Sequence, residues 1–286
     1  LISIDLETRD PELKSKGSGA VIGNGEIIGV AVAVDGWCKY YPFGHEGGGN
    51  LDKKKILNWL TDVCATEATK IFHNAMYDVC WLRSYGIKVN GHIMDTMVMA
   101  SLVDENRMRY TLNALSWEYL GERKNESTLI EVAKNWGIDA KAELYKLPAI
   151  YVGEYAEKDA SLTLDLFKRL SFQIRKDNLT EIFDLETQLF PCLVDMKFKG
   201  VRVDIEKAHQ LKQRLLEQEK GLLQEIKQET QIDAQIWAAR SIATVFDKLK
   251  LPYKRTEKTN APSFTKNFLQ EHEHPCLLYT SPSPRD

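Results

Sequence analysis

Hydrophobic and polar residues alternate along the first eight positions of the chain, LISIDLET. A period of two is typical of a β-strand with one buried face. Because residues i and i+2 of a strand point the same way, the aliphatic residues at positions 2, 4 and 6 should enter a core. Asp5 and Glu7 should project together from the opposite face. Two adjacent carboxylates repel each other unless a cation lies between them or they take up protons.

The rest of the first half mixes strand-like and helix-like stretches. The pattern predicts strands at residues 1–8, 26–34, 37–43, 70–73 and 89–94, and a helix at residues 51–65. Asp35-Gly36 is a hairpin signal, so the first three strands should begin the sheet in antiparallel order. Asn74 and Asp95 follow the last two strands and can cap the helices that begin there. The Gly-rich stretches 9–25 and 44–50 indicate loops.

From Tyr110 onward the apolar spacing is helical almost throughout. Helices are predicted at residues 112–120, 127–136, 140–147, 151–176 and 178–199, the last broken near Pro191. Residues 200–203 read as a turn and a short strand. Asp204 should cap a long charged helix that runs to about Thr230. The chain is therefore an α/β protein whose mixed sheet is flanked by helices, followed by an α-helical region.

The amino-acid composition excludes few classes of protein or partner. The chain has 286 residues, of which 43% are hydrophobic and 28% charged, an ordinary globular mixture. No stretch is long and apolar enough to span a membrane, so we expect no membrane partner. The five cysteines are scattered without a C-x-x-C pair, which favours reduced thiols and a cytoplasmic location. A net charge of −3 leaves a nucleic-acid partner open, because such a partner needs only a local basic patch.

Both ends of the chain suggest a fragment. The sequence opens within a strand and lacks an initiator Met. Residues 276–286 (CLLYTSPSPRD) match the translation of a transposase-type sequencing adapter, so we expect them to be non-native. The parent gene is expected to continue beyond Pro275.

Three further residues join the first carboxylate pair. Asp78 lies in NAMYD directly after a predicted strand, and Tyr155 and Asp159 lie four residues apart on one helix face. Each has an ordinary alternative: Asp78 could be a surface helix residue, and Tyr155 with Asp159 a simple tyrosine–acid pair. The three patterns in this order are far more specific than any one of them alone: D-x-E, N-x-x-Y-D and Y-x-x-x-D.

This set resembles the three exonuclease motifs of the DEDD superfamily, in its tyrosine-containing branch. The resemblance implies a ribonuclease H-like fold and removal of nucleotides from 3′ ends with two divalent metal ions, Mg²⁺ or Mn²⁺. It also implies that Asp5, Glu7, Asp78 and Asp159 are the metal ligands and that all five residues are catalytic, with Tyr155 positioning the attacking water. Two metals can activate a water and stabilise the leaving oxygen. Tyrosine, with an ordinary pKa near 10, suits orientation better than proton removal.

The second half distinguishes among exonucleases. The stretches MKFKGVRVD (196–204) and TEKTNAPSF (256–264) resemble the start of the polymerase domain of family A DNA polymerases. The resemblance implies an exonuclease domain at residues 1–176 and a truncated thumb at residues 177–275, without the polymerase active site. We therefore expect a monomeric proofreading exonuclease of a polymerase in DNA replication, which binds single-stranded DNA 3′ ends and, through the thumb, primer–template duplex.

Two alternatives stay open. One is a stand-alone RNase D-like exoribonuclease, and the other is a nucleic-acid-binding module that no longer turns over. A cluster of basic residues near the end of the chain could contact phosphates or could be a solvated loop: Lys248, Lys250, Lys254, Arg255 and Lys258.

Overall fold

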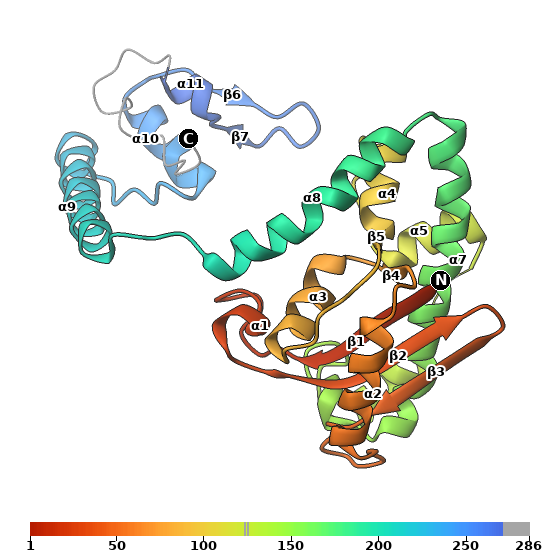
Figure 1. Cartoon of the computed structure of the whole chain (residues 1–286). Coiled ribbons are helices and arrows are strands. Elements are labelled where there is room, and N and C mark those ends of the chain that lie inside the picture. The colour runs from red at the N-terminus through yellow and green to blue at the C-terminus, as the bar shows by residue number, and fades with distance from the viewer. Residues whose placement is uncertain (123, 125, 271–286) are drawn as a thin grey trace. The chain divides into compact units, whose positions relative to one another are not determined.

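A five-stranded mixed sheet organises the first part of the chain (Figure 1). The computed structural model describes residues 1–122, 124 and 126–270. The sheet order is β3-β2-β1-β4-β5, with the strands β1 Ile2–Arg9, β2 Glu26–Val34, β3 Trp37–Pro42, β4 Lys70–Phe72 and β5 Ile93–Asp95. β1 lies at the centre and pairs antiparallel with β2 and parallel with β4. The predicted antiparallel start and α/β class are confirmed.

Helices cover both faces of this sheet. The chain divides into two compact units, of which the first is Leu1–Gly200. This first unit contains α1 Gly19–Ile22, α2 Lys53–Ala65, α3 Ala75–Ser84, α4 Thr96–Val103, α5 Leu112–Leu120, α6 Ser127–Trp136, α7 Gly153–Lys176 and α8 Thr180–Lys199, with two 3-10 turns, η1 Leu144–Lys146 and η2 Ala149–Tyr151. α2 and α3 lie on one face of the sheet, and α7 runs along the other (Figure 1). α7 also packs on α4 and α5, so it joins the sheet to the outer helices.

The alternation in β1 places its aliphatic side chains on one face of the sheet and its acidic ones on the other, as predicted. Ile4 and Leu6 are buried in the core on the α2–α3 side, with Trp81 and Leu82 of α3. On the other face, the β2 and β3 residues Ala31, Ala33 and Tyr40 form a second core with Ala156 and Ala160 of α7. Small residues on α7 let the helix approach the sheet closely. Asp5 and Glu7 share this second face.

Several local predictions were wrong. The predicted loop 9–25 contains the short helix α1, where the Asp10 carboxylate accepts the Gly19 N–H. The predicted helix 140–147 is only the turn η1, because Asp139 accepts the backbone N–H groups of Lys141 and Ala142 and forms a turn. β5 starts at Ile93, since it pairs only with the three residues of β4.

Helix α8 passes through Pro191 without the predicted break. Phe190 and Val194, on either side of the proline, are buried against the sheet core, and this packing holds the helix together. Residues 201–203 form no strand. Gly200 follows α8 with φ of 67°, a left-handed conformation that glycine adopts without strain.

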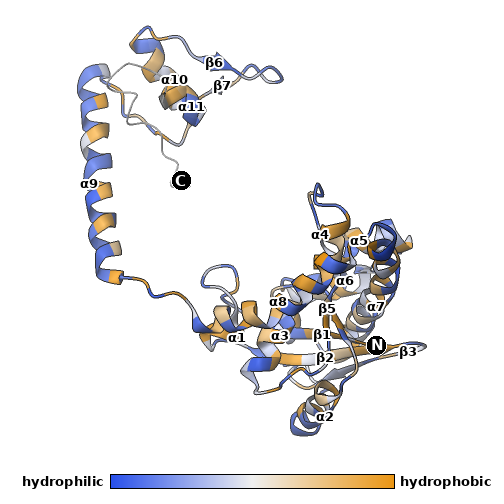
Figure 2. Cartoon of the chain, turned by 45° about the horizontal axis from the view of Figure 1, so that its top comes forward, coloured by the Kyte–Doolittle hydropathy of each residue, from blue (hydrophilic) through white to orange (hydrophobic). Residues whose placement is uncertain are grey.

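The second compact unit begins at Val201. It contains α9 Ile205–Thr230, α10 Ala239–Lys248, the strands β6 Lys254–Arg255 and β7 Pro262–Ser263, and α11 Lys266–Gln270. Asp204 caps α9 as predicted, accepting the Lys207 N–H at 2.9 Å. Apolar residues recur along α9 between charged ones (Figure 2), and Leu211, Leu215 and Leu216 are exposed. No helix among the described residues could cross a membrane.

The first compact unit ends at Gly200 and thus includes α8. The sequence-based division ends the exonuclease domain at residue 176 and assigns α8 to the thumb region. The proposed adapter sequence, residues 276–286, lies outside the described residues.

Candidate active site

The pairing of β1 with β2 sets the face from which the first two carboxylates project. Asp5 lies opposite Ala31 and Glu7 opposite Gly29. Directly opposed residues in antiparallel strands project from the same face. Both acidic side chains therefore project from the face of the sheet that α7 covers. Asp5 and Glu7 are each half-buried there.

Asp78 continues the hydrogen bonding of β1 beyond the end of β4. The β1–β4 register is confined to Ile2 and Ser3 of β1. Further along, the Leu6 N–H donates to the Asp78 carboxylate at 3.0 Å in a buried position. The side chain of Asp78 therefore takes the place of a strand carbonyl and points toward the acidic part of β1.

Asp95 anchors the start of the helix that carries Asp78. Its carboxylate accepts the N–H groups of Asn74 at 3.0 Å and Ala75 at 2.8 Å, and it also caps α4 through Met97, as predicted. Asn74 occupies the N-cap position of α3, but its side chain makes no capping hydrogen bond. The prediction that Asn74 caps this helix was wrong in that respect.

Helix α7 supplies the remaining two predicted residues. Asp159 is 4% exposed, and its Oδ2 forms an ion pair with Lys124. Its Oδ1 is buried and has no hydrogen-bond partner. The Lys124 ammonium also lies 5.1 Å from the centre of the Tyr155 ring. Asp159 therefore combines a paired oxygen with an unpaired one.

The five predicted residues influence one another electrostatically. Burial, and next the charge of Asp159, raise the pKa of Asp5 to about 7. Burial and then Asp5 raise the pKa of Glu7, and the same two causes raise that of Asp78. Burial raises the pKa of Asp159, whereas the charge of Lys124 and a hydrogen bond from Tyr155 act to lower it. The charges of Asp5, Asp159 and Asp78 all contribute to the raised pKa of Glu7.

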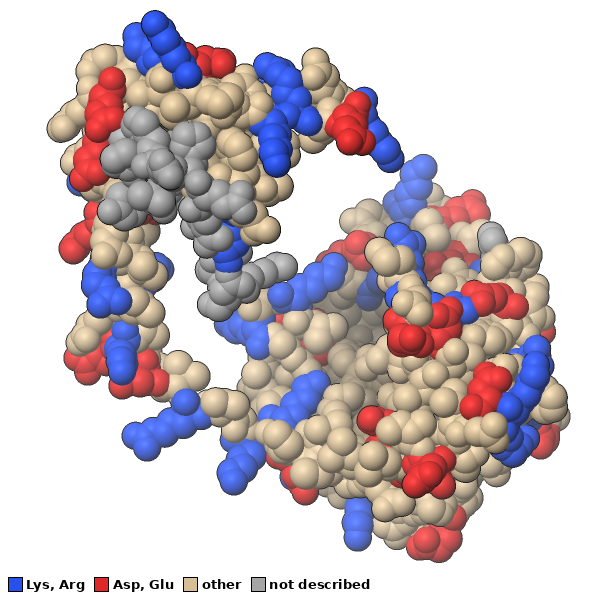
Figure 3. All heavy atoms as spheres, turned by 90° about the horizontal axis from the view of Figure 1, so that it is seen from above, with Lys and Arg blue, Asp and Glu red and all other residues tan. Residues whose placement is uncertain are grey.

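The Tyr155 hydroxyl stays neutral in this setting. Burial, followed by the charges of Glu7 and Asp159, raises its pKa above the ordinary value. A cavity of about 400 Å³ opens beside it, lined by Cys38, Lys124, Glu154, Tyr155, Glu157, Lys158 and Ser161. In the space-filling view the first unit is hollowed, and side chains of both signs surround the hollow (Figure 3).

The donor set fits a divalent cation by its chemistry. Carboxylate oxygens are the ligands that Mg²⁺ prefers, and an unpaired buried oxygen such as Asp159 Oδ1 lacks a positive partner. Within the described part of the chain, however, no three acidic, histidine or cysteine side chains already stand in a metal-holding arrangement. Lys124 provides the positive charge beside Asp159 instead.

Sequence reasoning missed Lys124, Tyr40 and His45. Lys124 lies in a polar stretch between two helices, and no spacing relates it to Asp159. Tyr40 and His45 are buried and hydrogen-bonded to each other at 2.7 Å. In the sequence, the available signal was a histidine two residues after the predicted strand 37–43. His73, directly after β4, has its Nδ1 2.8 Å from the Thr96 hydroxyl.

Comparison with known proteins identifies the family. The profile of the 3′–5′ exonuclease family matches residues 1–175. The chain belongs to this 3′–5′ exonuclease family. The family predicted from the motifs, and with it a hydrolytic nuclease activity, is confirmed.

The relatives of this exonuclease are polymerases. A DNA-directed DNA polymerase of Pseudomonas phage M6 is 30% identical over 282 residues, covering 96% of this chain and 42% of the relative. DNA polymerase I of Chloroflexus aurantiacus is 28% identical and covers 71% of this chain and 21% of the relative. The chain therefore spans less than half of these relatives. They favour a polymerase-linked exonuclease over an RNase D-like one.

A solved structure extends the similarity of the fold to nearly the whole chain. The POL domain of Pol1 from M. smegmatis, in complex with DNA primer–template and dNTP, superposes with a TM-score of 0.66 at 17% identity. It covers 98% of this chain and 43% of the Pol1 chain. At this identity the similarity establishes the fold alone.

Proposed function

We propose that this exonuclease is the proofreading part of a DNA-directed DNA polymerase and removes nucleotides from the 3′ ends of DNA during replication. The polymerase relatives support the proposal, together with one structural observation. That observation is the electrostatic influence of Asp5, Asp78 and Asp159 on the carboxyl of Glu7, with the neutral hydroxyl of Tyr155 also under the charges of Glu7, Asp159 and Asp5.

The four carboxylates would hold two divalent cations, Mg²⁺ or Mn²⁺. When bound, such cations supply the Lewis acidity that phosphodiester hydrolysis requires. Asp78 is held in place by the Leu6 N–H, and this hydrogen bond restricts its rotation. Asp159 would exchange its ion pair with Lys124 for a new cation partner.

The role proposed for Tyr155 is orientation of the attacking water. Its raised pKa keeps the hydroxyl protonated, so the group can donate a hydrogen bond and can also accept one. The ring packs against the second core, which limits the positions that the hydroxyl can reach. The cavity beside Tyr155 leaves room for part of a nucleotide.

The second unit would contact primer–template duplex as part of a thumb. The exposed strand β6 contributes Lys254 and Arg255, and Lys and Arg side chains stand out on this unit (Figure 3). Such side chains suit contact with backbone phosphates. The phage and bacterial relatives support the cytoplasm of a bacterial or infected cell as the place of action, and a single copy contains the full set of site residues.

Single-turnover digestion of a 3′-labelled DNA strand, with titrated Mg²⁺ or Mn²⁺, tests the proposal. Asp5→Ala should abolish cleavage and weaken metal binding, because the charge of Asp5 acts on both Glu7 and Asp78. Tyr155→Phe should slow cleavage by about 10²–10⁴-fold, the usual contribution of one positioned proton-handling group, and leave metal binding nearly unchanged.

The exposed acid Asp62 on α2 provides the matched control, since Asp62→Ala should cleave like the wild type. Full cleavage in a chelator, or an Asp5→Ala variant more active than Tyr155→Phe, would contradict the assigned roles. An RNA strand cleaved faster than DNA of the same sequence would favour the exoribonuclease alternative.

A further inference from the structure

Gly29 provides a niche beside Glu7 that a tyrosine fills. A Cβ at position 29 would collide with the hydroxyl and ring of Tyr40. The Tyr40 ring therefore occupies the side-chain space of residue 29. Gly29 is the direct partner of Glu7, and opposed Cβ positions in antiparallel strands lie about 4.5–5.5 Å apart. The Tyr40 hydroxyl is thus within reach of the Glu7 carboxylate.

The Tyr40 hydroxyl donates its proton in a hydrogen bond to His45. The His45 ring is 3% exposed, and its Nδ1 lies 2.9 Å from the carbonyl oxygen of Leu147. A carbonyl can only accept, so Nδ1 carries the proton. Burial keeps the ring neutral by lowering its pKa, which leaves Nε2 as an acceptor. Tyr40 therefore donates to His45 Nε2, at 2.7 Å.

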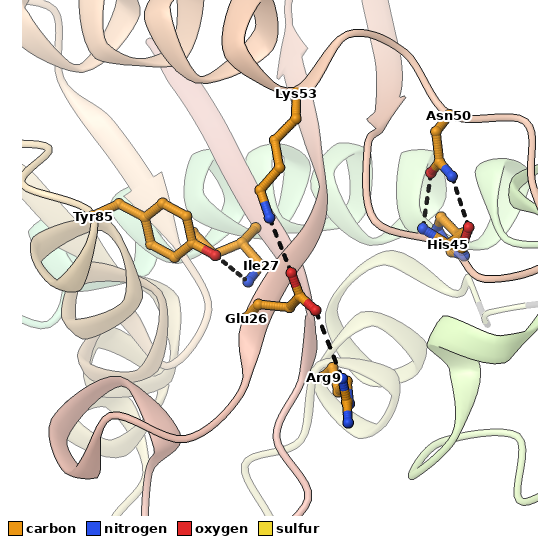
Figure 4. A network of polar contacts seen from close by, with 7 residues as sticks. All are labelled: Arg9, Glu26, Ile27, His45, Asn50, Lys53 and Tyr85. Atoms are coloured by element: carbon orange, nitrogen blue, oxygen red, sulfur yellow. Dashed lines mark hydrogen bonds and ion pairs between the residues drawn. The ribbon is translucent and has the colours of Figure 1, made fainter.

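The histidine is itself held by its surroundings. Its backbone N–H donates to the Asn50 side chain at 2.8 Å, and the Asn50 amide donates back to the His45 carbonyl at 2.6 Å (Figure 4). Gly47 lets this loop approach Pro148, because a Cβ at position 47 would collide with the proline backbone. The imidazole is thereby fixed between the sheet and the segment that leads into α7.

We propose that Tyr40 and His45 are positioning residues for Glu7: His45 withholds the Tyr40 proton, so that both Glu7 oxygens remain available to a divalent cation. The inference rests on the metal site proposed above. Without His45, the Tyr40 hydroxyl would turn toward Glu7, donate to its carboxylate and compete with the cation. The tyrosine ring itself serves as a wall that limits where the Glu7 side chain can lie.

Binding of Mn²⁺ to the full chain, measured by calorimetry without DNA, tests this arrangement. His45→Leu should weaken binding by about 10-fold, at the lower end of the usual effect of outer-shell partners. Tyr40→Phe keeps the ring but has no proton to donate, so its affinity should stay within about threefold of the wild type. Adding Tyr40→Phe to His45→Leu should restore most of the lost affinity. His45→Gln, which can donate to Leu147 and accept from Tyr40, should also bind normally.

Tyr85→Phe is the control for the loss of a tyrosine hydroxyl beside β2. Tyr85 accepts the Ile27 N–H at 3.1 Å on the opposite face of the sheet (Figure 4), so its loss should lower the unfolding temperature without changing Mn²⁺ affinity. The unfolding temperature of every variant identifies any that fail to fold.

The outcomes separate this inference from the proposed function. If the wild type and Asp5→Ala bind Mn²⁺ equally, or neither binds, the metal site itself is wrong. If Asp5→Ala abolishes binding but the double variant binds no better than His45→Leu, the metal site stands and the positioning role is overturned. A purely structural role for His45 predicts this second result, because the double variant would then be at least as disturbed as the single one.

Discussion

At the level of single residues, Asp78 combines a structural contact with a proposed ligand role. Its carboxylate accepts the Leu6 N–H where the β1–β4 ladder has ended. Asp78→Ala leaves that buried N–H without a partner and should lower the free energy of unfolding by about 1–3 kcal/mol. Asp78→Asn keeps an acceptor oxygen and removes a charge beside Asp5. In a chelator it should be at least as stable as the wild type.

Urea unfolding of the two variants in a chelator provides the measurement. Both should lose metal-dependent cleavage, whereas only Asp78→Ala should lose stability. Equal destabilisation of the two variants would show that the hydrogen bond to Leu6 contributes nothing beyond packing.

The five candidate residues were proposed from the sequence alone: Asp78 from its motif, and the other four because alternation and helical spacing define the face on which a side chain lies. Asp5 and Glu7 share a strand face, and Tyr155 and Asp159 share a helix face. Lys124 and the Tyr40–His45 pair could not be predicted in the same way. Their contacts join positions distant along the chain or depend on the niche at Gly29, and no short-range period encodes such contacts.

At the level of elements, long periodic segments were predicted well and short ones poorly. β2, the following hairpin and the long helices α7 and α9 match the predicted stretches. α1 and η1 depend on side-chain hydrogen bonds from Asp10 and Asp139, which override the local pattern. The continuity of α8 through Pro191 comes from packing on the first unit, which a sequence pattern does not reveal.

Helix α8 leads to a prediction about the smallest stable exonuclease. It buries Phe190 and Val194 against the sheet core and Phe183 against α7 and its neighbours. A chain of residues 1–176 lacks these three side chains. It should be roughly 4.5–9 kcal/mol less stable than a chain of residues 1–200, at about 1.5–3 kcal/mol for each buried side chain. Thermal unfolding of both fragments measures the difference, and equal midpoints would show that the exonuclease domain ends at residue 176.

At the level of the whole molecule, the acidic site should couple stability to pH and, if it holds the proposed cations, to metal. The pKa of Asp5 is about 7 in the folded chain against an ordinary value of 3.8, and those of Glu7 and Asp78 are also raised. A carboxyl group with a raised pKa binds more protons in the folded chain than in the unfolded chain. Without metal, the stability that this extra proton binding contributes is therefore lost as pH rises from about 4 to 7. Divalent cations should reverse this loss of stability at high pH, because they compensate the negative charge of the ionised carboxylates.

We therefore expect Mg²⁺ to raise the unfolding temperature more at about pH 8 than at about pH 5. Burial lowers the pKa of His73 to about 4, and this adds stability as pH rises toward 6.5. That contribution is the same with Mg²⁺ and with chelator, so the difference between the two curves isolates the carboxylates. Asp5→Asn should reduce this difference. A stabilisation by Mg²⁺ that is independent of pH would contradict the linkage.

The position of β1 also affects how the protein is made. A nascent chain can pair β1 with β2, and β2 with β3, as soon as the hairpin leaves the ribosome. Asp159 on α7 follows roughly ten seconds later at about 5–20 residues per second. Until then the face that carries Asp5 and Glu7 lacks its covering helix. Ribosome-stalled chains that end before α7 should protect the amides of β2 from hydrogen exchange yet bind no Mn²⁺. Nuclease activity would thus appear only after the first unit is complete, and a half-made enzyme could not attack DNA.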